Sequence, residues 1–301
     1  MKPSLGYAWI AAAAALWGVA ATVVKYLFNN QYDPLIIVQT RVTLACIALV
    51  LTFLASNRKM LVIDLRDIPL FLFVGICGVA GSNFFYYFAI KESNVATSIL
   101  LQYTAPILVM LYVTVVQHER FTLSKFLALL CATAGIFFAV GAYDEGIIRA
   151  NLKGVVFALI AAVTFAIFNI GGKPLTRKYS AWTVLTYVLA GASAFWLFIN
   201  PPWTIASAGY SGRDWMVFSF ISAISILLPY GFYFSGLKNI QASKAIITSM
   251  LEPVVAIISE VLFLDGRMSA LQCMGAALVV GGIILLQVNS AADAVPNIAQ
   301  E

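Results

Sequence analysis

The fold of this chain is decided by a stretch of sequence that occurs twice. Residues 85–106 read FYYFAIKESNVATSILLQYTAP, and residues 232–253 read FYFSGLKNIQASKAIITSMLEP. The two copies are offset by 147 residues, and at this offset the match extends without a gap from 73–130 to 220–277. Both copies are almost entirely apolar. This pattern is typical of a membrane protein built from two similar halves, as many secondary transporters are.

Composition places most of the chain in contact with lipid. Hydrophobic residues make up 62% of the sequence and charged residues only 10%, whereas soluble domains carry about 25% charged residues. An apolar helix needs about 20 residues to cross the hydrocarbon core of a bilayer. Ten such runs occur: Tyr7–Phe28, Pro34–Ala55, Pro69–Ile90, Val95–Val116, Ser124–Tyr143, Lys153–Lys173, Ala181–Asn200, Asp214–Leu237, Ser243–Leu264 and Ala270–Val288. We therefore predict an all-α integral membrane protein with ten transmembrane helices.

Two five-helix repeats account for the ten spans. We expect residues 1–150 to form the first repeat, residues 151–290 to form the second, and residues 291–301 to form a polar C-terminal tail. Because five is an odd number, equivalent loops of the two repeats must lie on opposite faces of the membrane, and the repeats are then inverted. The connecting loops are short and leave no room for a soluble domain.

Lysine and arginine residues predict the orientation. With the N-terminus inside, eleven of the eighteen basic residues lie on the inner side, six on the outer side, and Arg41 within a span. Cytoplasmic loops carry an excess of basic residues, so we expect both termini in the cytoplasm. The loop at Arg58–Arg66 holds three basic residues and its counterpart near Arg213 holds one, as inversion requires. The net charge of +5 reflects this topology and predicts no nucleic-acid partner.

The residues present argue against several other chemistries. The first apolar run is too long for the core of a signal peptide, so we do not expect it to be cleaved. Cys46, Cys77, Cys131 and Cys273 lie singly in separate spans and predict neither a disulfide nor a metal site. No P-loop sequence occurs, which argues against ATP hydrolysis. An intramembrane enzyme would need a nucleophile with a base, a carboxylate pair or a metal cluster, and the single His118 lies in a loop. We expect no enzyme and no cofactor.

Matched prolines interrupt the fourth and ninth spans. Pro106 and Pro253 occupy equivalent positions near the middle of these spans. Each removes a backbone hydrogen bond and frees a carbonyl group one turn earlier. Matched interruptions in the two repeats point to a central binding or gating site. They are equally consistent with a symmetric packing kink.

Polar and aromatic side chains cluster around these prolines as the candidate lining of a central cavity. Asn83 and Tyr86 are three residues apart, as are Tyr230 and Tyr233, so each pair shares a helix face. The candidate substrate-binding residues are Trp17, Asn83, Tyr86, Gln102, Tyr103, Phe165, Asn169, Tyr230, Tyr233 and Glu252. An aromatic cavity with a few fixed polar groups suits a small zwitterion with an apolar side chain better than a sugar or a phosphate. Taken singly, each of the aromatic residues is more typical of helix packing.

Glu252 is the candidate that most needs an explanation. An ionised carboxylate at mid-bilayer costs about 2.5–3.5 kcal/mol even on the permissive insertion scale. Glu252 must therefore face water, pair with a cation or stay protonated. Either it holds a substrate ammonium group or exchanges a proton, or it fixes the kink by a hydrogen bond between helices. Arg41, also within a span, either extends to the interface or meets a substrate carboxylate.

Spans five and ten carry few polar side chains and several small residues, among them Gly135 and Gly275. Such small-residue faces allow helices to approach closely in a membrane. We expect these spans to pack at the periphery, and they are a candidate interface for a homo-oligomer.

Short motifs spread along the chain resemble a known family. The sequence LEPVVA at 251–256, followed by Gln272, Gly275, Gly281 and Gly282, resembles the second EamA-type repeat of the drug/metabolite transporter superfamily. In the first half, Trp17-Gly18 and Pro106 with Gly135 fit the first repeat. One departure is Asp265-Gly266-Arg267, where the family often has Gly-Glu-Arg.

Within the superfamily the chain most resembles the YddG-type bacterial amino-acid exporters. The resemblance implies broad export of aromatic and other neutral amino acids, such as phenylalanine, threonine and methionine, by alternating access across the bacterial inner membrane. By position, it also implies that Trp17, Asn83, Tyr103 and Phe165 line the cavity. The expected partners are thus an amino-acid substrate and the lipid bilayer. The alternative is a multidrug or organic-cation exporter of the same fold, with Glu252 as the counter-charge.

Overall fold

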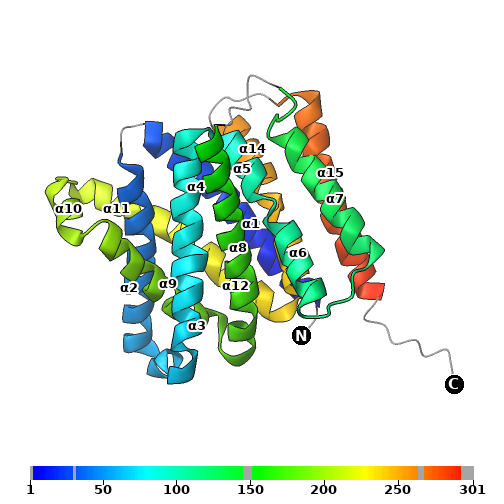
Figure 1. The fold of residues 1–301 in the computed structure, drawn as a ribbon. Helices are drawn as coiled ribbons and strands as arrows, with labels where there is room; N and C mark the ends of the chain where they lie inside the picture. Colours follow the sequence, from blue (N-terminus) through cyan, green and yellow to red (C-terminus); the bar gives the residue numbers. More distant parts are fainter. Residues whose placement is uncertain (1–2, 30–31, 145–150, 264–267, 293–301) are drawn as a thin grey trace.

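A computed structural model describes residues 3–29, 32–144, 151–263 and 268–292. Within these ranges the chain is helical and contains no strand (Figure 1). Some sequence-based expectations fall outside them: the basic residues Arg149 and Arg267, the Asp265-Gly266-Arg267 motif, and the C-terminal tail beyond Ala292.

The helices form ten successive spans. Spans one, two, five, six, seven and ten are the single helices α1 (Pro3–Asn29), α2 (Pro34–Ser56), α7 (Leu123–Ala139), α8 (Leu152–Lys178), α9 (Ala181–Ile199) and α15 (Ala270–Ala292). Span three joins α3 (Ile68–Phe73) to α4 (Gly81–Glu92), and span eight joins α11 (Gly212–Ser222) to α12 (Leu228–Asn239). Span four consists of α5 (Val95–Gln102) and α6 (Ala105–Val115), and span nine of α13 (Ala242–Ser249) and α14 (Leu251–Phe263). Short helices η1 (Arg58–Leu61), η2 (Leu65–Asp67) and α10 (Pro202–Ser207) lie in the loops.

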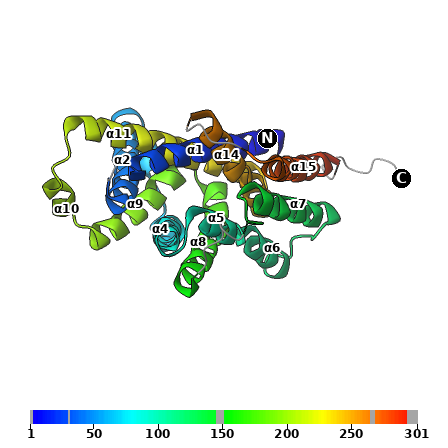
Figure 2. The same ribbon diagram turned by 90° about the horizontal axis from the view of Figure 1, so that it is seen from above.

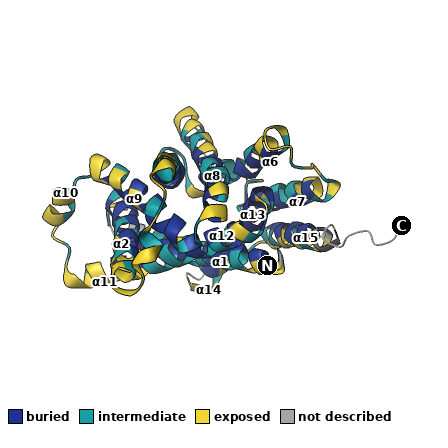
Figure 3. Cartoon of the chain, turned by 90° about the horizontal axis from the view of Figure 1, so that it is seen from below, coloured by how far each residue is buried: buried dark blue, intermediate teal, exposed yellow. Residues whose placement is uncertain are grey.

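Length and composition fit a membrane protein. Nine of the described stretches are long and apolar enough to span a bilayer, and the tenth, Leu123–Ala139, is apolar and 17 residues long, about the shortest helix that can cross. Figure 3 shows buried residues along the middle of the molecule and exposed residues around its outside. Many of the exposed side chains are large and apolar, such as Leu111, Phe198 and Leu262, and the bilayer accounts for their exposure. The ten-span prediction is confirmed.

Polar side chains at the ends of the apolar runs fix where the helices begin. An Asp, Asn, Thr or Ser side chain accepts a hydrogen bond from the first free backbone N–H groups, which have no partner inside the helix. The capping residues of this kind are Asp33, Asn94, Thr122, Asn151, Ser180 and Ser211. Each of these residues therefore marks the end of a loop and the start of the next helix.

Contacts between loops show how the spans alternate. The loop before α3 meets the end of α8, where Lys178 Nζ lies 2.6 Å from the Asp67 carboxylate. At the other face, Tyr32 donates a hydrogen bond to Asp214, at the start of α11, over 2.5 Å. Helix α2 separates these two contacts. The equivalent loops 57–67 and 200–211 thus lie at opposite ends of the molecule, and the five-helix repeats are inverted.

Spans three and eight contain a feature that the sequence analysis did not predict. Each is interrupted by a π-helical segment, η3 (Val74–Ala80) in the first repeat and η4 (Ala223–Leu227) in the second, at equivalent places. A π segment widens one helical turn and is often found at functional sites. Gly78 lets η3 pack on the backbone of α8, since a Cβ atom there would lie 3.0 Å from Phe168 Cα.

The small residues of spans five and ten pack against each other within one chain. A Cβ atom on Gly135 would lie 2.8 Å from the Gly275 carbonyl oxygen, and one on Gly275 would lie 2.6 Å from the Gly135 carbonyl oxygen. Figure 2 shows α7 and α15 side by side at one end of the molecule, as expected for peripheral spans. The faces built from Gly135 and Gly275 are therefore already covered, and a homo-oligomer through these spans would have to use their outer faces.

Candidate functional site

The two broken spans bring their interruptions to the centre of the molecule. Because Pro106 has no N–H group, the Gln102 carbonyl lacks its helical donor, and Pro253 frees the Ser249 carbonyl in the same way. Helix α5 ends at Gln102 and α13 ends at Ser249. The residues that follow, Tyr103 and Met250, are equivalent in the two repeats and lie in one buried cluster.

A hydrogen bond joins the two breaks. Tyr103 donates its hydroxyl proton to Glu252 Oε2 over 2.8 Å. Glu252 lies in the first turn of α14, where the partial positive charge of the helix N-terminus favours a carboxylate. Tyr103 belongs to the first repeat and Glu252 to the second, so this contact crosses the boundary between them. Glu252 is half-buried, and the Tyr103 hydroxyl already provides it with one neutral partner.

Arg41 of α2 approaches the same centre from another direction. Its Nη2 donates to Asn83 Oδ1 over 2.6 Å, and Asn83 Nδ2 donates to the Val79 carbonyl in the π segment over 2.8 Å. The Arg41 Nε atom is buried without a hydrogen-bond partner among the described residues. The charges of Arg41 and Glu252 interact electrostatically, and Tyr86 lies close enough to interact with both.

Aromatic rings form the wall between these polar groups. The Trp17 ring lies 5.0 Å from that of Tyr230 and 5.4 Å from that of Tyr233, measured between centroids. Phe165 is stacked on Phe168 at 6.0 Å and also faces Tyr103 at 6.5 Å. The rings come from spans one, four, six and eight, so four separate helices contribute to the wall.

Two predicted site residues, Asn169 and Tyr233, lie deeper than a substrate-contacting role suggests. Asn169 and Tyr233 are fully buried and Asn169 donates a hydrogen bond to the Tyr233 hydroxyl. Gln102, which is half-buried, donates to Ser82 over 3.2 Å and so ties α5 to α4. These contacts support the aromatic wall from behind. Trp17, Asn83, Tyr86, Phe165, Tyr230 and Glu252 are half-buried.

Sequence reasoning left two parts of this arrangement out of the candidate set. Arg41 was considered without being assigned to the site, although a lone arginine in an apolar span is a signal of function or of a specific partner. The π segments leave no periodicity by which a sequence reveals them. The local signals are the glycines of GICGVAG at 75–81 for η3, since glycine in a helix often marks close backbone packing, and Pro229 after η4, which removes a backbone hydrogen bond.

Comparison with known proteins places this geometry in context. The profile of the EamA-like transporter family matches residues 4–141 and 152–288. An uncharacterised transporter of Archaeoglobus fulgidus is 25% identical over 283 residues, which cover 92% of this chain and 98% of the relative. The uncharacterised inner membrane transporter YicL of Salmonella typhimurium is 20% identical over 283 residues, 92% of this chain and 93% of its own. A solved structure, titled only as the crystal structure of a protein, superimposes with a TM-score of 0.79 over 98% of this chain and all of that chain, at 20% identity. It has the same fold.

Proposed function

The chain belongs to the EamA-like transporter family, and from that premise we propose that it exports neutral amino acids, aromatic ones included, as a secondary transporter with broad specificity. It works by alternating access through the site between the broken spans. In this proposal it lies in the inner membrane of a bacterium with both termini in the cytoplasm, as the distribution of lysine and arginine favours.

The presence of one positive and one negative side chain at the same centre, Arg41 and Glu252, carries the substrate assignment. An amino acid presents a carboxylate and an ammonium group on one carbon, and each needs a partner of opposite charge when it leaves water. Among the described residues, the buried Nε atom of Arg41 has no hydrogen-bond partner, and the Glu252 carboxylate accepts a hydrogen bond from the neutral Tyr103 hydroxyl. The substrate carboxylate would bind Arg41 and its ammonium group Glu252. Each bond would join two groups of opposite charge, whereas the described hydrogen-bond partners of Arg41 and Glu252 are neutral groups, and bonds between two charged groups are the stronger kind.

The aromatic wall accounts for the breadth of specificity. An apolar side chain of variable size would lie against Trp17 and Tyr230, whose rings meet edge to face at 5.0 Å. A hydrophobic pocket discriminates by only about 1–3 kcal/mol per methylene group. Phenylalanine, methionine and threonine would therefore all be accepted.

The position of the two charges also supports alternating access. Arg41 belongs to the first repeat and Glu252 to the second. A bound zwitterion bridges them and pulls the repeats together, while breaking the Tyr103–Glu252 hydrogen bond frees the two interruptions to move. The breaks at Tyr103 and Met250 are the points at which a span can bend without losing further backbone hydrogen bonds.

An exporter of organic cations is the second candidate, because Glu252 and the aromatic wall would also hold a cation. The two candidates differ at Arg41. A cation has no carboxylate for Arg41 to bind, and the positive charge of this residue would repel it.

The test is transport by the purified protein in liposomes without ATP. We expect exchange of labelled phenylalanine, methionine and threonine, and at least a tenfold loss of that exchange in Arg41→Gln, since a charge-assisted hydrogen bond contributes about 1.5–3 kcal/mol. Lys91→Gln, an exposed residue at the end of α4, is the matched control and should transport normally. Flux of organic cations alone, undiminished in Arg41→Gln, would refute the amino-acid assignment.

A further inference from the structure

A second recess lies outside the central site. It has a volume of about 640 Å³ and is bounded by α3, α6 and the C-terminal half of α8. Ile167, Ile170 and Gly171 of α8 form its floor, whereas the neighbouring Phe168 and Asn169 face the opposite way, toward Tyr233 of α12. Helix α8 thus separates this recess, here called the α8 groove, from the proposed transport site.

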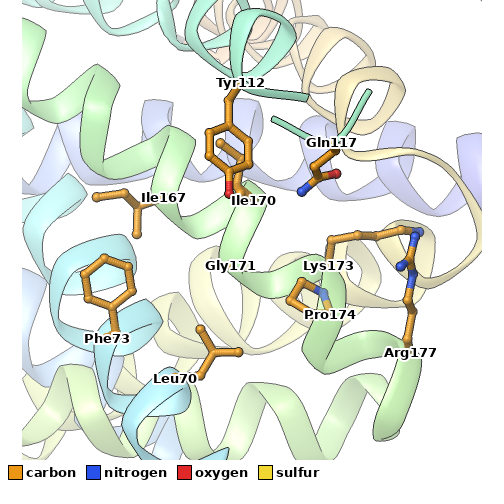
Figure 4. Close-up of a pocket in the computed structure, with 10 residues that line it drawn as sticks. All are labelled: Leu70, Phe73, Tyr112, Gln117, Ile167, Ile170, Gly171, Lys173, Pro174 and Arg177. Atoms are coloured by element: carbon orange, nitrogen blue, oxygen red, sulfur yellow. The ribbon is translucent and has the colours of Figure 1, made fainter. Parts of the chain in front are cut away.

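The α8 groove is amphipathic. Figure 4 shows Gln117, Lys173 and Arg177 gathered on one side and Leu70, Phe73 and Ile167 on the other. None of the described residues that line it is acidic. The outward faces of α6 beside it carry exposed Leu111 and Val115, which is expected of a surface that meets acyl chains.

The basic side of the groove has no anion of its own among the described residues. Arg177 is exposed and pairs with no described carboxylate. Lys173 donates to the neutral carbonyls of Leu237 and Ile240, each over 2.5 Å. Glu119 is the acidic group that acts on Lys173, and it is already paired with Lys125 at 2.6 Å. Lys173 Nζ also donates to the Lys238 carbonyl over 3.5 Å, so its described partners are backbone carbonyls. Neither Lys173 nor Arg177 is therefore paired with an acidic side chain among the described residues.

The groove has the depth of one leaflet. Ten residues separate Ile167 from Arg177, which corresponds to about 15 Å along a helix, half of the hydrocarbon core of about 30 Å. Arg177 lies at the face where Lys178 meets Asp67, the same face that carries the basic loop at Arg58 and Lys59. An acyl chain that extends inward from a headgroup at Arg177 would follow the apolar floor.

We propose that the α8 groove binds an anionic phospholipid, with the phosphate at Arg177 and Lys173 and one acyl chain along Ile170 and Ile167. Lipid tails gain little by moving from bilayer to protein, because both are apolar. Selectivity must come from the charged end, where basic pockets between transmembrane helices hold anionic headgroups. A zwitterionic lipid with the same chains would bind more weakly.

The experiment measures lipid binding to the full-length protein by native mass spectrometry, with phosphatidylglycerol and phosphatidylcholine of identical chains. We expect a preference for phosphatidylglycerol that falls about fivefold in Arg177→Gln, given the contribution of one basic residue near an anionic surface. Arg66→Gln removes an exposed arginine on the same face outside the groove and should keep the preference. Ile170→Trp fills the floor and should weaken binding of both lipids.

Four results would overturn the proposal. Equal binding of the two lipids, or an unchanged preference in Arg177→Gln, would show that the groove does not select lipids by the charge of the headgroup. Displacement of phosphatidylglycerol by phenylalanine would make the groove part of the substrate route. Crosslinks between Arg177→Cys side chains of two copies would make it an interface. None of these readouts requires transport, so the proposal and the amino-acid assignment stand or fall separately.

Discussion

At the scale of single residues, the central site depends on contacts between parts of the sequence that are far apart. Glu252 could be identified from sequence because a carboxylate in an apolar span is costly. Its donor Tyr103, 149 residues away, is a candidate from its place before Pro106 and from the family resemblance, and neither of these predicts the bond between the two residues. Asn169 and Tyr233 are the opposite case, because their polarity and position make them site candidates whereas the structure brings them into contact with each other. Each is polar and near the centre, but both are fully buried, and the Asn169 amide donates to the Tyr233 hydroxyl.

Substitution of Glu252 by glutamine tests whether this residue exchanges a proton. Glu252→Gln keeps the size of the side chain and an acceptor for Tyr103 but removes the charge. We expect amino-acid exchange in liposomes to fall sharply and to lose its pH dependence. Glu260→Gln, the same substitution two turns later on α14, should leave the pH profile as it is. A wild-type profile in Glu252→Gln would reduce Glu252 to a packing residue.

At the scale of helices, the sequence predicted the interruptions at the matched prolines and missed the π segments of spans three and eight. The breaks before Pro106 and Pro253 follow from a missing N–H group, which is a local property. The π segment η4 ends two residues before Pro229, whose missing N–H group frees the Ser225 carbonyl. The π segment η3 depends on how span three packs against α8, as at Gly78. The same limit applies to α7 and α15, whose small residues indicated close packing without indicating the partner.

The contact between α7 and α15 can be tested by adding a methyl group. Gly275→Ala would place a Cβ atom 2.6 Å from the Gly135 carbonyl oxygen, and overpacking of this kind costs about 1–3 kcal/mol. We expect a lower melting temperature in detergent. Gly281→Ala is the control, because nothing lies within 4 Å of the position its Cβ atom would take. Equal melting temperatures for both variants would contradict the close approach of these helices.

At the scale of the whole molecule, the number of spans was the most predictable property, because apolar length and parity are read directly from the sequence. Ten spans and inverted repeats both follow from it, and the loop contacts of Lys178 with Asp67 and of Tyr32 with Asp214 agree. The short helix α10 between spans seven and eight was not predicted, since Pro202–Ser207 is too short for any periodic signal.

Inversion predicts which loops share a compartment. On a cysteine-free background, Arg58→Cys and Arg213→Cys should react with an impermeant maleimide from opposite sides of oriented vesicles. Lys59→Cys, next to Arg58 in the chain, should follow Arg58→Cys. Labelling of positions 58 and 213 from the same side would contradict inverted repeats and, with them, alternating access between two mirrored halves.

The carboxylate of Glu252 has no acidic counterpart at the equivalent position of the first repeat. Ala105 occupies the equivalent place in the first repeat, one residue before Pro106 as Glu252 precedes Pro253. A carrier with two identical halves would have two orientations of equal energy, and its forward and backward rate constants would match. Here the carboxylate belongs to one half alone, so we expect the two orientations to differ in free energy even at equal solute concentrations. The kinetics of the transport cycle would then be asymmetric, although the equilibrium across the membrane would not.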